Sequence, residues 1–383
     1  MWFSVFLAGS SYGACMPFLP LYMTHELQTT EYVAIWTGAV FSVTFLGSSV
    51  MAPFWGAWAD KVGQKRMAIR AGIGLAITYF LQGMCQNVEQ LFIVRSMVGL
   101  IAGFVPASLS LVSSTIPAER VGWGMGLMQA ALSSGAIMGP LMGGYLSSWF
   151  GMRTSFYVGG VALMLNTVLV LCFVQDLPHP KLSSVKVQVW QDIKTTLANR
   201  ELLQVMLMFM TVQCCIMLIN PVLANYVAEL RGGLNDARTV ELAGFVFSLT
   251  GIAGMLAATF WGKLGQRRGY TKTLSQLMFG AGLVYLGQIW VSSVTQLALV
   301  QFTYGLFLAG ATPNINGRLV EITTAADRGK GFGLATSAQQ MGGCIGPLLG
   351  GCLASFLPIR YVLIFTALIY LILGFYTARK TRI

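Results

Sequence analysis

The sequence predicts an all-α integral membrane protein with twelve transmembrane helices arranged as two parallel repeats of six. Three observations lead to this fold class: the composition, the number of long apolar runs, and an internal repeat. The chain has 383 residues, of which 55% are hydrophobic and only 10% are charged. Soluble proteins carry about 25% charged residues, so this chain lacks the polar side chains that a soluble globule needs on its surface.

Apolar runs of membrane-spanning length occur twelve times. The hydrocarbon core of a bilayer requires about 20 residues of helix. The first run begins at once, without the basic segment of a signal peptide, so we expect it to be a span of the mature protein. The predicted spans are residues 2–23, 33–57, 66–86, 90–115, 122–148, 153–175, 201–228, 239–261, 272–293, 297–320, 330–355 and 359–378.

Positive charge predicts the orientation of these spans. If the first span runs outward, the inner loops and the C-terminal tail contain most of the 24 Lys and Arg residues. The positive-inside rule then places both termini in the cytoplasm, and it accounts for the net charge of +11 without a nucleic-acid partner. Only four basic residues fall in the outer loops: Arg153, Arg231, Arg238 and Arg360.

Composition also predicts the domain boundaries. Residues 176–200 are rich in charge and contain Pro178 and Pro180, as expected of a cytoplasmic linker. They separate an N-terminal six-helix bundle, residues 1–175, from a C-terminal six-helix bundle, residues 201–383.

Short sequences recur in the two halves about 206 residues apart. "FWG" at Phe54 returns at Phe260, and "GAIMGPLMGG" from Gly135 returns as "GGCIGPLLGG" from Gly342. Because each half contains six spans, the two repeats have the same orientation. Parallel repeats of this kind predict a transporter with a central site where the halves meet.

Glycines spaced by four residues predict close helix contacts. Gly135, Gly139 and Gly143 lie on one helix face, and small residues on such a face let helix backbones approach each other in a membrane. Pro140 removes one backbone hydrogen bond and bends the helix. The spacing alone leaves two alternatives open, namely a contact between the two halves and packing within one half.

Several motifs resemble the drug:proton antiporters of the major facilitator superfamily. The string of Gly135, Gly139, Pro140, Gly143 and Gly144 fits the antiporter motif G-x-x-x-G-P-x-x-G-G of the fifth span. The loop "GAWADKVGQKRMAIR", the segment "LFIVRSMVGLIAGF" and the segment "SYGACMPFLPLY" resemble the other motifs of this twelve-span family. The resemblance covers the whole chain, and the MdtG-like bacterial multidrug transporters are the most similar branch. It implies the major facilitator fold and proton-coupled drug export.

The loop motif implies a conformational latch. Asp60 lies at the inner end of the second span, near the expected start of the eleventh, and helix N-termini carry partial positive charge. We expect Asp60, together with the basic residues Lys61, Lys65 and Arg66, to favour the outward-open state. The alternative is a carboxylate in a solvated loop.

Candidates for proton coupling are few, because no acidic residue lies clearly in the middle of a predicted span. Arg95 lies inside the fourth span, where the resemblance implies that it faces the cavity and tunes a proton site or binds anionic groups. The alternative is that it extends to the outer surface. Glu229, Glu241 and Glu321 are the nearest acidic candidates, although an ion pair with Arg318 is also expected for Glu321.

Uncharged polar and soft apolar side chains are the candidates for the substrate cavity. Such a lining suits amphiphilic compounds of varied shape, although some of these side chains are expected to bond neighbouring helices instead. The candidates are Tyr12, Met16, Met128, Gln129, Gln213, Asn220, Phe247, Asn314 and Gln340.

The sequence therefore predicts a secondary active transporter that exports lipophilic or cationic drugs, not an enzyme. No phosphate-binding G-x-x-x-x-G-K-[ST] motif is present, and no cofactor or metal ion is expected. The expected partners are a small amphiphilic substrate, protons and membrane lipid, and the expected state is a monomer in the bacterial inner membrane. Two alternatives stay open: a transporter dedicated to one endogenous metabolite or lipid, and a membrane sensor that does not transport.

Overall fold

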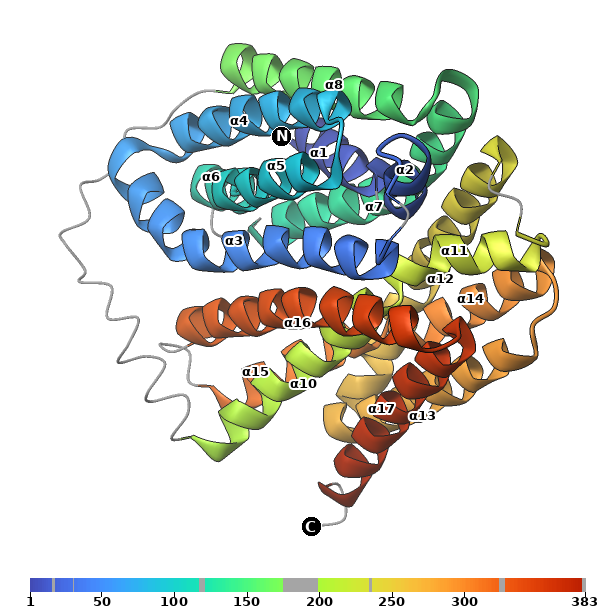
Figure 1. Cartoon of the computed structure of the whole chain (residues 1–383). Coiled ribbons are helices and arrows are strands. Elements are labelled where there is room, and N and C mark those ends of the chain that lie inside the picture. The colour runs from blue at the N-terminus through green and yellow to red at the C-terminus, as the bar shows by residue number, and fades with distance from the viewer. Residues whose placement is uncertain are drawn as a thin grey trace. The chain divides into compact units, whose positions relative to one another are not determined.

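The computed structural model describes residues 1–15, 18–29, 31–116, 121–174, 199–233, 236–323 and 328–380. Throughout these ranges the regular secondary structure is helical (Figure 1). Within these described ranges, eight segments are long and apolar enough to cross a membrane. They are Val33–Ala52, Gln64–Met84, Val88–Val112, Met152–Phe173, Arg200–Leu230, Arg238–Arg268, Val294–Ile322 and Ile359–Arg379.

Helices of the first half fall on the predicted spans. Two of these spans are each represented by two shorter helices, and the second of them is divided at Gly103, which has φ +144°. The helices are α1 (Trp2–Cys15), α2 (Leu19–His25), α3 (Val33–Val62), α4 (Gln64–Met84), α5 (Val88–Ile101), α6 (Phe104–Thr115), α7 (Val121–Phe150) and α8 (Met152–Phe173). The predicted linker, residues 176–200, lies almost entirely outside the described residues.

Helices of the second half repeat this order. Two predicted spans are again divided, at Ile219 before Pro221 and at Gly310. The helices are α10 (Arg200–Leu218), α11 (Asn220–Leu230), α12 (Ala237–Arg268), α13 (Tyr270–Gly287), the short 3₁₀ helix η2 (Gln288–Trp290), α14 (Val294–Leu308), α15 (Ala311–Ile322), α16 (Arg328–Phe356) and α17 (Ile359–Lys380).

The turns between α3 and α4 and between α12 and α13 show how local sequence fixes the repeat. Gly63 has φ +106° and Gly269 has φ +92°, a backbone region that only glycine adopts without strain. Each glycine reverses the chain between two helices within a single residue. The twofold occurrence of this turn agrees with the internal repeat of the sequence.

The helices form two compact units, and the unit boundaries cut through two helices. The first unit consists of Met1–Glu31, Val43–Val187 and Asn235–Ser248, and it therefore includes the start of α12. The second unit consists of Tyr32–Ser42, Gln188–Leu234 and Leu249–Ile383, and it includes the start of α3. The bundle boundaries at residues 175 and 201 stay a prediction.

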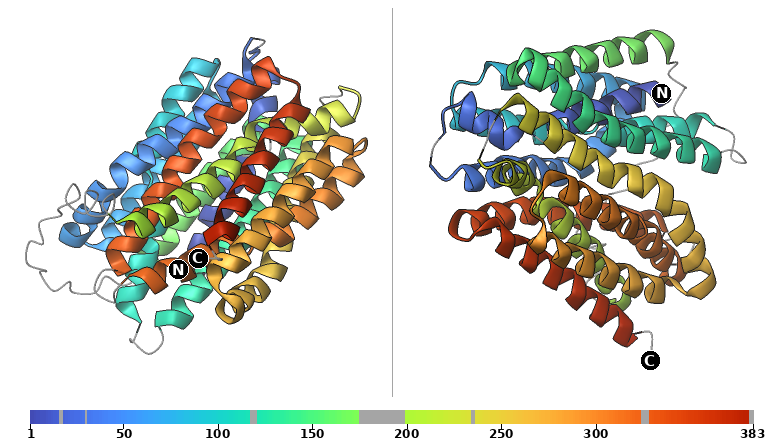
Figure 2. Two further views of the ribbon diagram at one scale, coloured as in Figure 1. Left: turned by 90° about the horizontal axis from the view of Figure 1, so that it is seen from below. Right: turned by 90° about the vertical axis from the view of Figure 1, so that its right-hand side faces the viewer.

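Within each unit the same helix pairs carry most of the packing. In the first unit α1 lies along α7, and α4 lies along α8 (Figure 1). In the second unit α10 lies along α16, and α13 lies along α17 (Figure 2). The predicted six-helix repeat thus reappears as a repeat of helix pairs.

Candidate functional site

Arg95 is a buried cation on α5, in the first unit. Its side chain and backbone together are only 3% exposed, and its Nε atom has no hydrogen-bond partner among the described residues. Thr44 Oγ1 donates a hydrogen bond to the Arg95 carbonyl oxygen at 3.2 Å, which joins α3 to α5 at this level. The guanidinium is therefore held inside the unit and does not extend to the protein surface.

The groups that interact electrostatically with Arg95 are hydroxyls and thiols, and Cys85 at the end of α4 is one of them. Tyr12 and Cys15 on α1 and Tyr79 on α4 lie close enough to interact electrostatically with the guanidinium. Tyr79 Oη donates a hydrogen bond to the Ser11 carbonyl oxygen at 3.0 Å and so joins α4 to α1. Arg95 and the predicted cavity residue Tyr12 are thus brought together in one polar cluster.

The repeat places an uncharged residue at the position of Arg95. Trp55 Nε1 donates to the Leu100 carbonyl oxygen at 2.8 Å, and Trp261 Nε1 donates to the Leu306 carbonyl oxygen at 2.7 Å. The two tryptophans are 206 residues apart, and the same offset makes Gln301 the counterpart of Arg95. The glycine strings, which are 207 residues apart, indicate the neighbouring residue Phe302. Gln301 is 2% exposed, and its Oε1 atom has no partner among the described residues.

Three of the four glycines of the antiporter motif, Gly135, Gly139 and Gly143, pack within the first half of the chain. A Cβ atom added to Gly135 would lie 2.6 Å from the Phe6 carbonyl oxygen, and one added to Gly139 would lie 2.6 Å from the Ser10 carbonyl oxygen. Gly143 meets the carbonyl oxygen of Ala14. This glycine face therefore lets the backbone of α7 contact the backbone of α1.

The second half repeats this seam. Gly342, Gly346 and Gly350 on α16 face the backbone of α10 in the same manner. An added Cβ atom at each of these glycines would meet the carbonyl oxygen of Met210, Cys214 or Leu218, respectively. The seams α1–α7 and α10–α16 are thus built alike.

A second face of each motif helix contacts a helix from the other half of the chain. In the first unit, Gly244 of α12 abuts the Pro140 carbonyl oxygen, and Ser248 Oγ donates to the Ile137 carbonyl oxygen at 2.8 Å. A Cβ atom at Gly144 would lie 3.3 Å from the Cα atom of Glu241. The face of α7 with Gly135, Gly139 and Gly143 thus packs within one half of the chain, and a different face of α7 contacts α12.

The corresponding face of α16 contacts the start of α3 in the second unit. Gly38 of α3 lies against the Pro347 carbonyl oxygen, and Gly351 of α16 lies against the Ala34 carbonyl oxygen. Ser42 Oγ donates a hydrogen bond to the Cys344 carbonyl oxygen at 2.5 Å. Small residues on both helices make these backbone contacts possible.

The acidic candidates lie in different environments. Glu241 is half-buried near Gly144, whereas Glu229 is exposed at the end of α11. Glu321 is exposed and forms the expected ion pair with Arg318, with 3.1 Å between Oε2 and Nη1. Arg318 also pairs with Glu201 at 3.5 Å. None of the three is brought to Arg95 by the contacts that the structure describes.

The latch residues are only partly described. The side chains of Asp60 and Lys61 lie outside the described part of the structure. Lys65 Nζ donates a hydrogen bond to the Leu171 carbonyl oxygen at 3.0 Å, so Lys65 joins the start of α4 to the end of α8. Arg66 is exposed. The latch stays a prediction.

Some cavity candidates have identifiable packing roles. Met128 is 2% exposed and packs in an apolar cluster with Val5, Val112 and Ala131. Asn314 Nδ2 donates to the carbonyl oxygens of Gly310 at 2.7 Å and Trp261 at 3.3 Å, which ties α15 to α12.

The other cavity candidates have little or no described polar bonding. Asn220 Nδ2 lies 3.2 Å from Met217 Sδ. Met16 lies outside the described residues. Gln129 is exposed, and four candidates are half-buried: Tyr12, Gln213, Phe247 and Gln340.

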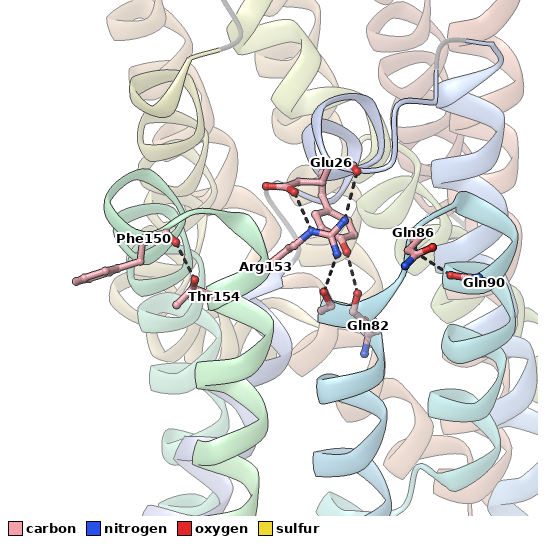
Figure 3. A network of polar contacts seen from close by, with 9 residues as sticks. Glu26, Gln82, Gln86, Gln90, Phe150, Arg153 and Thr154 are labelled. Atoms are coloured by element: carbon pink, nitrogen blue, oxygen red, sulfur yellow. Dashed lines mark hydrogen bonds and ion pairs between the residues drawn. The ribbon is translucent and has the colours of Figure 1, made fainter.

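Arg153, Glu26 and Tyr22 form a group of polar contacts, here called the clamp, that the sequence did not predict (Figure 3). Arg153 Nε, at the start of α8, donates to Glu26 Oε2 at 2.8 Å, and Arg153 Nη1 donates to the Gly83 carbonyl oxygen at 3.0 Å. Tyr22 Oη donates to the Gln82 carbonyl oxygen at 2.8 Å beside them. The clamp therefore joins α2, α4 and α8.

A second cation missed from the sequence is Arg70 on α4. Its guanidinium carbon lies 3.6 Å from the centre of the Trp55 ring, and Nη2 donates to the Ile101 carbonyl oxygen at 3.0 Å. Cation–π stacking and this hydrogen bond hold Arg70 between α3 and the end of α5. Arg70 is the last residue of the loop motif "GAWADKVGQKRMAIR", so that motif was the available signal in the sequence.

Comparison with known proteins identifies the family. A model of the Major Facilitator Superfamily matches residues 1–294 and 205–382. The chain belongs to the major facilitator superfamily. It is therefore a multi-pass membrane protein of a transporter family. The predicted all-helical fold class is confirmed. The number of twelve spans stays a prediction.

Two relatives that match over nearly the full length of this chain carry the same name. The chain is 32% identical over 383 residues to "Multidrug resistance protein MdtG" of Enterobacter lignolyticus (strain SCF1), covering 100% of this chain and 91% of that protein. It is 33% identical over 392 residues to the protein of the same name in Proteus mirabilis (strain HI4320), covering 99% and 96%. The predicted resemblance to the MdtG-like branch is confirmed.

Solved structures share the fold at low sequence identity. The nucleoside transporter NupG superposes with a TM-score of 0.81 at 16% identity, covering 100% of this chain and 98% of that one. A bacterial homologue of the human lysosomal transporter Spinster, in an inward-facing and occupied conformation, gives a TM-score of 0.80 at 14% identity, covering 100% and 95%. These similarities establish the major facilitator fold.

Proposed function

We propose that this protein is a secondary active efflux transporter that exports lipophilic or cationic small molecules in exchange for protons, by alternating access. The observation that carries the proposal is the 32–33% identity over nearly the full chain to proteins named for multidrug resistance. The presence of the complete antiporter motif from Gly135 to Gly144 supports it.

Arg95 is the residue on which this mechanism depends. Placing an arginine in the middle of a span costs about 2.5–3.5 kcal/mol on insertion scales, so a buried arginine needs partners, water or a function. Arg95 is buried with an unpartnered Nε. In the proposal it lines the transport path, where it either lowers the proton affinity of a neighbouring group or binds an anionic group of the substrate.

The orientation and the latch belong to the same proposal. Both termini lie in the cytoplasm, because that arrangement puts most of the Lys and Arg residues on the inner side. Asp60 docks at the N-terminal end of α16 and favours the outward-open state. Replacing Asp60 with Asn then shifts the conformational populations and slows transport, and unchanged populations would refute the latch. The transporter works as a monomer.

Uptake of fluorescent cationic dyes into everted membrane vesicles tests the function directly. Acidifying the vesicle interior should drive dye uptake, and a protonophore should abolish it. Two unrelated amphiphilic compounds should each compete with the dye. Transport of a single compound without competition would instead indicate a dedicated metabolite transporter, and no gradient-driven transport of any compound would indicate a sensor.

A further inference from the structure

A narrow groove lies between α10 and α17 in the second unit, apart from the polar cluster around Arg95. Its volume is about 230 Å³. The two helices run in opposite directions (Figure 1), which puts Gln204 and Tyr376 toward one end of the groove and Thr211 and Ile369 toward the other. Six of the residues that line it are Gln204, Leu207, Thr211, Ile369, Ile372 and Tyr376.

The groove opens to the outside of the unit and is closed beneath. The rim residues Leu207, Ile372 and Tyr376 are 45%, 67% and 42% exposed, whereas the floor residues Met208 and Leu373 are 5% and 8% exposed. Both helices belong to segments long and apolar enough to span a membrane, so we expect this exposed rim to face lipid. The groove is thus a depression in the lipid-facing surface.

The volume of the groove distinguishes between possible occupants. Sites for drug-sized ligands measure about 300–1,000 Å³ and bury most of the ligand. A groove of about 230 Å³ that is open along its side holds a slender apolar chain rather than a polycyclic drug.

Positively charged side chains near one end of the groove indicate that the polar part of its occupant is anionic. One turn beyond Gln204, α10 begins at Arg200, and one turn beyond Tyr376 on the antiparallel helix lies Arg379. Both arginines are exposed, and the guanidinium carbon of Arg379 lies 4.5 Å from the centre of the Phe375 ring. The N-terminal end of α10 adds partial positive charge at the same level.

We propose that the groove between α10 and α17 binds one acyl chain of an anionic phospholipid, whose headgroup lies against Arg200 and Arg379. The apolar walls match the acyl chain, and the amide of Gln204 and the hydroxyl of Tyr376 lie at the depth where chain gives way to headgroup. Juxtamembrane basic residues attract anionic lipids, whereas a zwitterionic lipid gains little from them. The site lies in the cytoplasmic leaflet in the orientation proposed above.

Photocrosslinking in nanodiscs tests this site with the full-length protein. The probe is a phospholipid with a diazirine in its acyl chain and either a phosphatidylglycerol or a phosphatidylcholine headgroup. After irradiation, peptide mass spectrometry should find label concentrated on α10 and α17. The phosphatidylglycerol probe should label these helices more strongly, by about fivefold for each arginine that contacts the headgroup.

Three variants separate the site from general contact with lipid. Leu207→Trp fills the groove and should lower labelling of α10 and α17 at least fivefold. Leu299→Trp is the matched control, because Leu299 is 64% exposed on α14 and does not line the groove. The double variant Arg200→Gln/Arg379→Gln should keep the phosphatidylcholine signal and abolish the preference for phosphatidylglycerol.

Three results would overturn the proposal. One is uniform labelling of all lipid-facing helices, and another is equal labelling in Leu207→Trp and Leu299→Trp. The third is equally strong labelling by a diazirine fatty alcohol that lacks a headgroup, which would make the groove a site for any apolar solute. Each variant is first checked for a monodisperse elution profile, so that loss of label reports on the groove.

Discussion

The two halves of the chain share a hydrogen-bonded framework but differ in charge. Trp55 and Trp261 donate to the carbonyl oxygens of Leu100 and Leu306 in the same register. Tyr22 Oη and Tyr226 Oη donate to the carbonyl oxygens of Gln82 and Gln288 at 2.8 and 2.9 Å. The glycine seams α1–α7 and α10–α16 are likewise equivalent. The framework is thus present twice.

Two cations of the first half, Arg95 and Arg70, have uncharged counterparts in the second half. Arg95 corresponds to Gln301 in the second half. Arg70, which stacks on Trp55, corresponds to Gln276. The first half has the Arg153–Glu26 ion pair, whereas the second half has Arg360 and Glu229 at the related positions, both exposed. A duplicated scaffold with charge in one half only is what the proposed role of Arg95 in the transport cycle predicts, with the shared framework serving packing.

The largest expected effect concerns the equivalence of the two seams. Gly143→Leu and Gly350→Leu should each destabilise the protein by about 3 kcal/mol or more, because an added side chain meets the backbone of α1 or α10 with nowhere to move. Gly333→Leu is the control on α16, since a Cβ atom there meets nothing within 4 Å. Thermal unfolding in detergent measures all three. A large loss in only one seam would contradict the equivalence.

The second prediction concerns the difference in charge. Arg95→Gln should lower the initial rate of dye transport at least tenfold, while Gln301→Leu should change it less than twofold. Arg95→Gln should leave the melting temperature unchanged or higher, because it removes a buried charge whose Nε lacks a partner. Equal losses of transport in both variants would show that the two halves are functionally equivalent.

The sequence predicts the framework well and the polar interior poorly. Apolar runs of 20 residues predict the helices, and the repeated glycine strings predict that the framework is duplicated, since both signals depend on composition along one helix. The Arg153–Glu26 pair joins residues 127 positions apart, and no local pattern connects them. Likewise, Met128 and Asn314 were expected in a cavity, but periodicity alone does not distinguish a cavity wall from a contact between helices.

A third prediction compares two tyrosines at equivalent positions. Tyr79 Oη donates to the Ser11 carbonyl oxygen, whereas the buried hydroxyl of Tyr285 has no partner among the described residues. Tyr79→Phe should therefore cost about 1 kcal/mol of stability, and Tyr285→Phe should be neutral or stabilising. Melting temperatures of the two variants give the comparison. A larger loss for Tyr285→Phe would reveal a bound water or another partner for its hydroxyl.

The smallest expected effect concerns the clamp between α2 and α8. Both side chains of the Arg153–Glu26 pair are 33% exposed, so the pair should contribute only about 0.5 kcal/mol. Glu26→Gln should lower the melting temperature slightly at low ionic strength, and the difference should shrink in 1 M salt, where screening is strong.

Glu229→Gln is the matched variant in the second half, where the described ion pairs include none between Glu229 and Arg360. It should leave the melting temperature unchanged at both salt concentrations. If Glu229→Gln instead lowered stability as much as Glu26→Gln, in a salt-dependent way, the second half would form the same clamp in solution. The difference in charge between the halves would then be confined to Arg70 and Arg95, inside the spans.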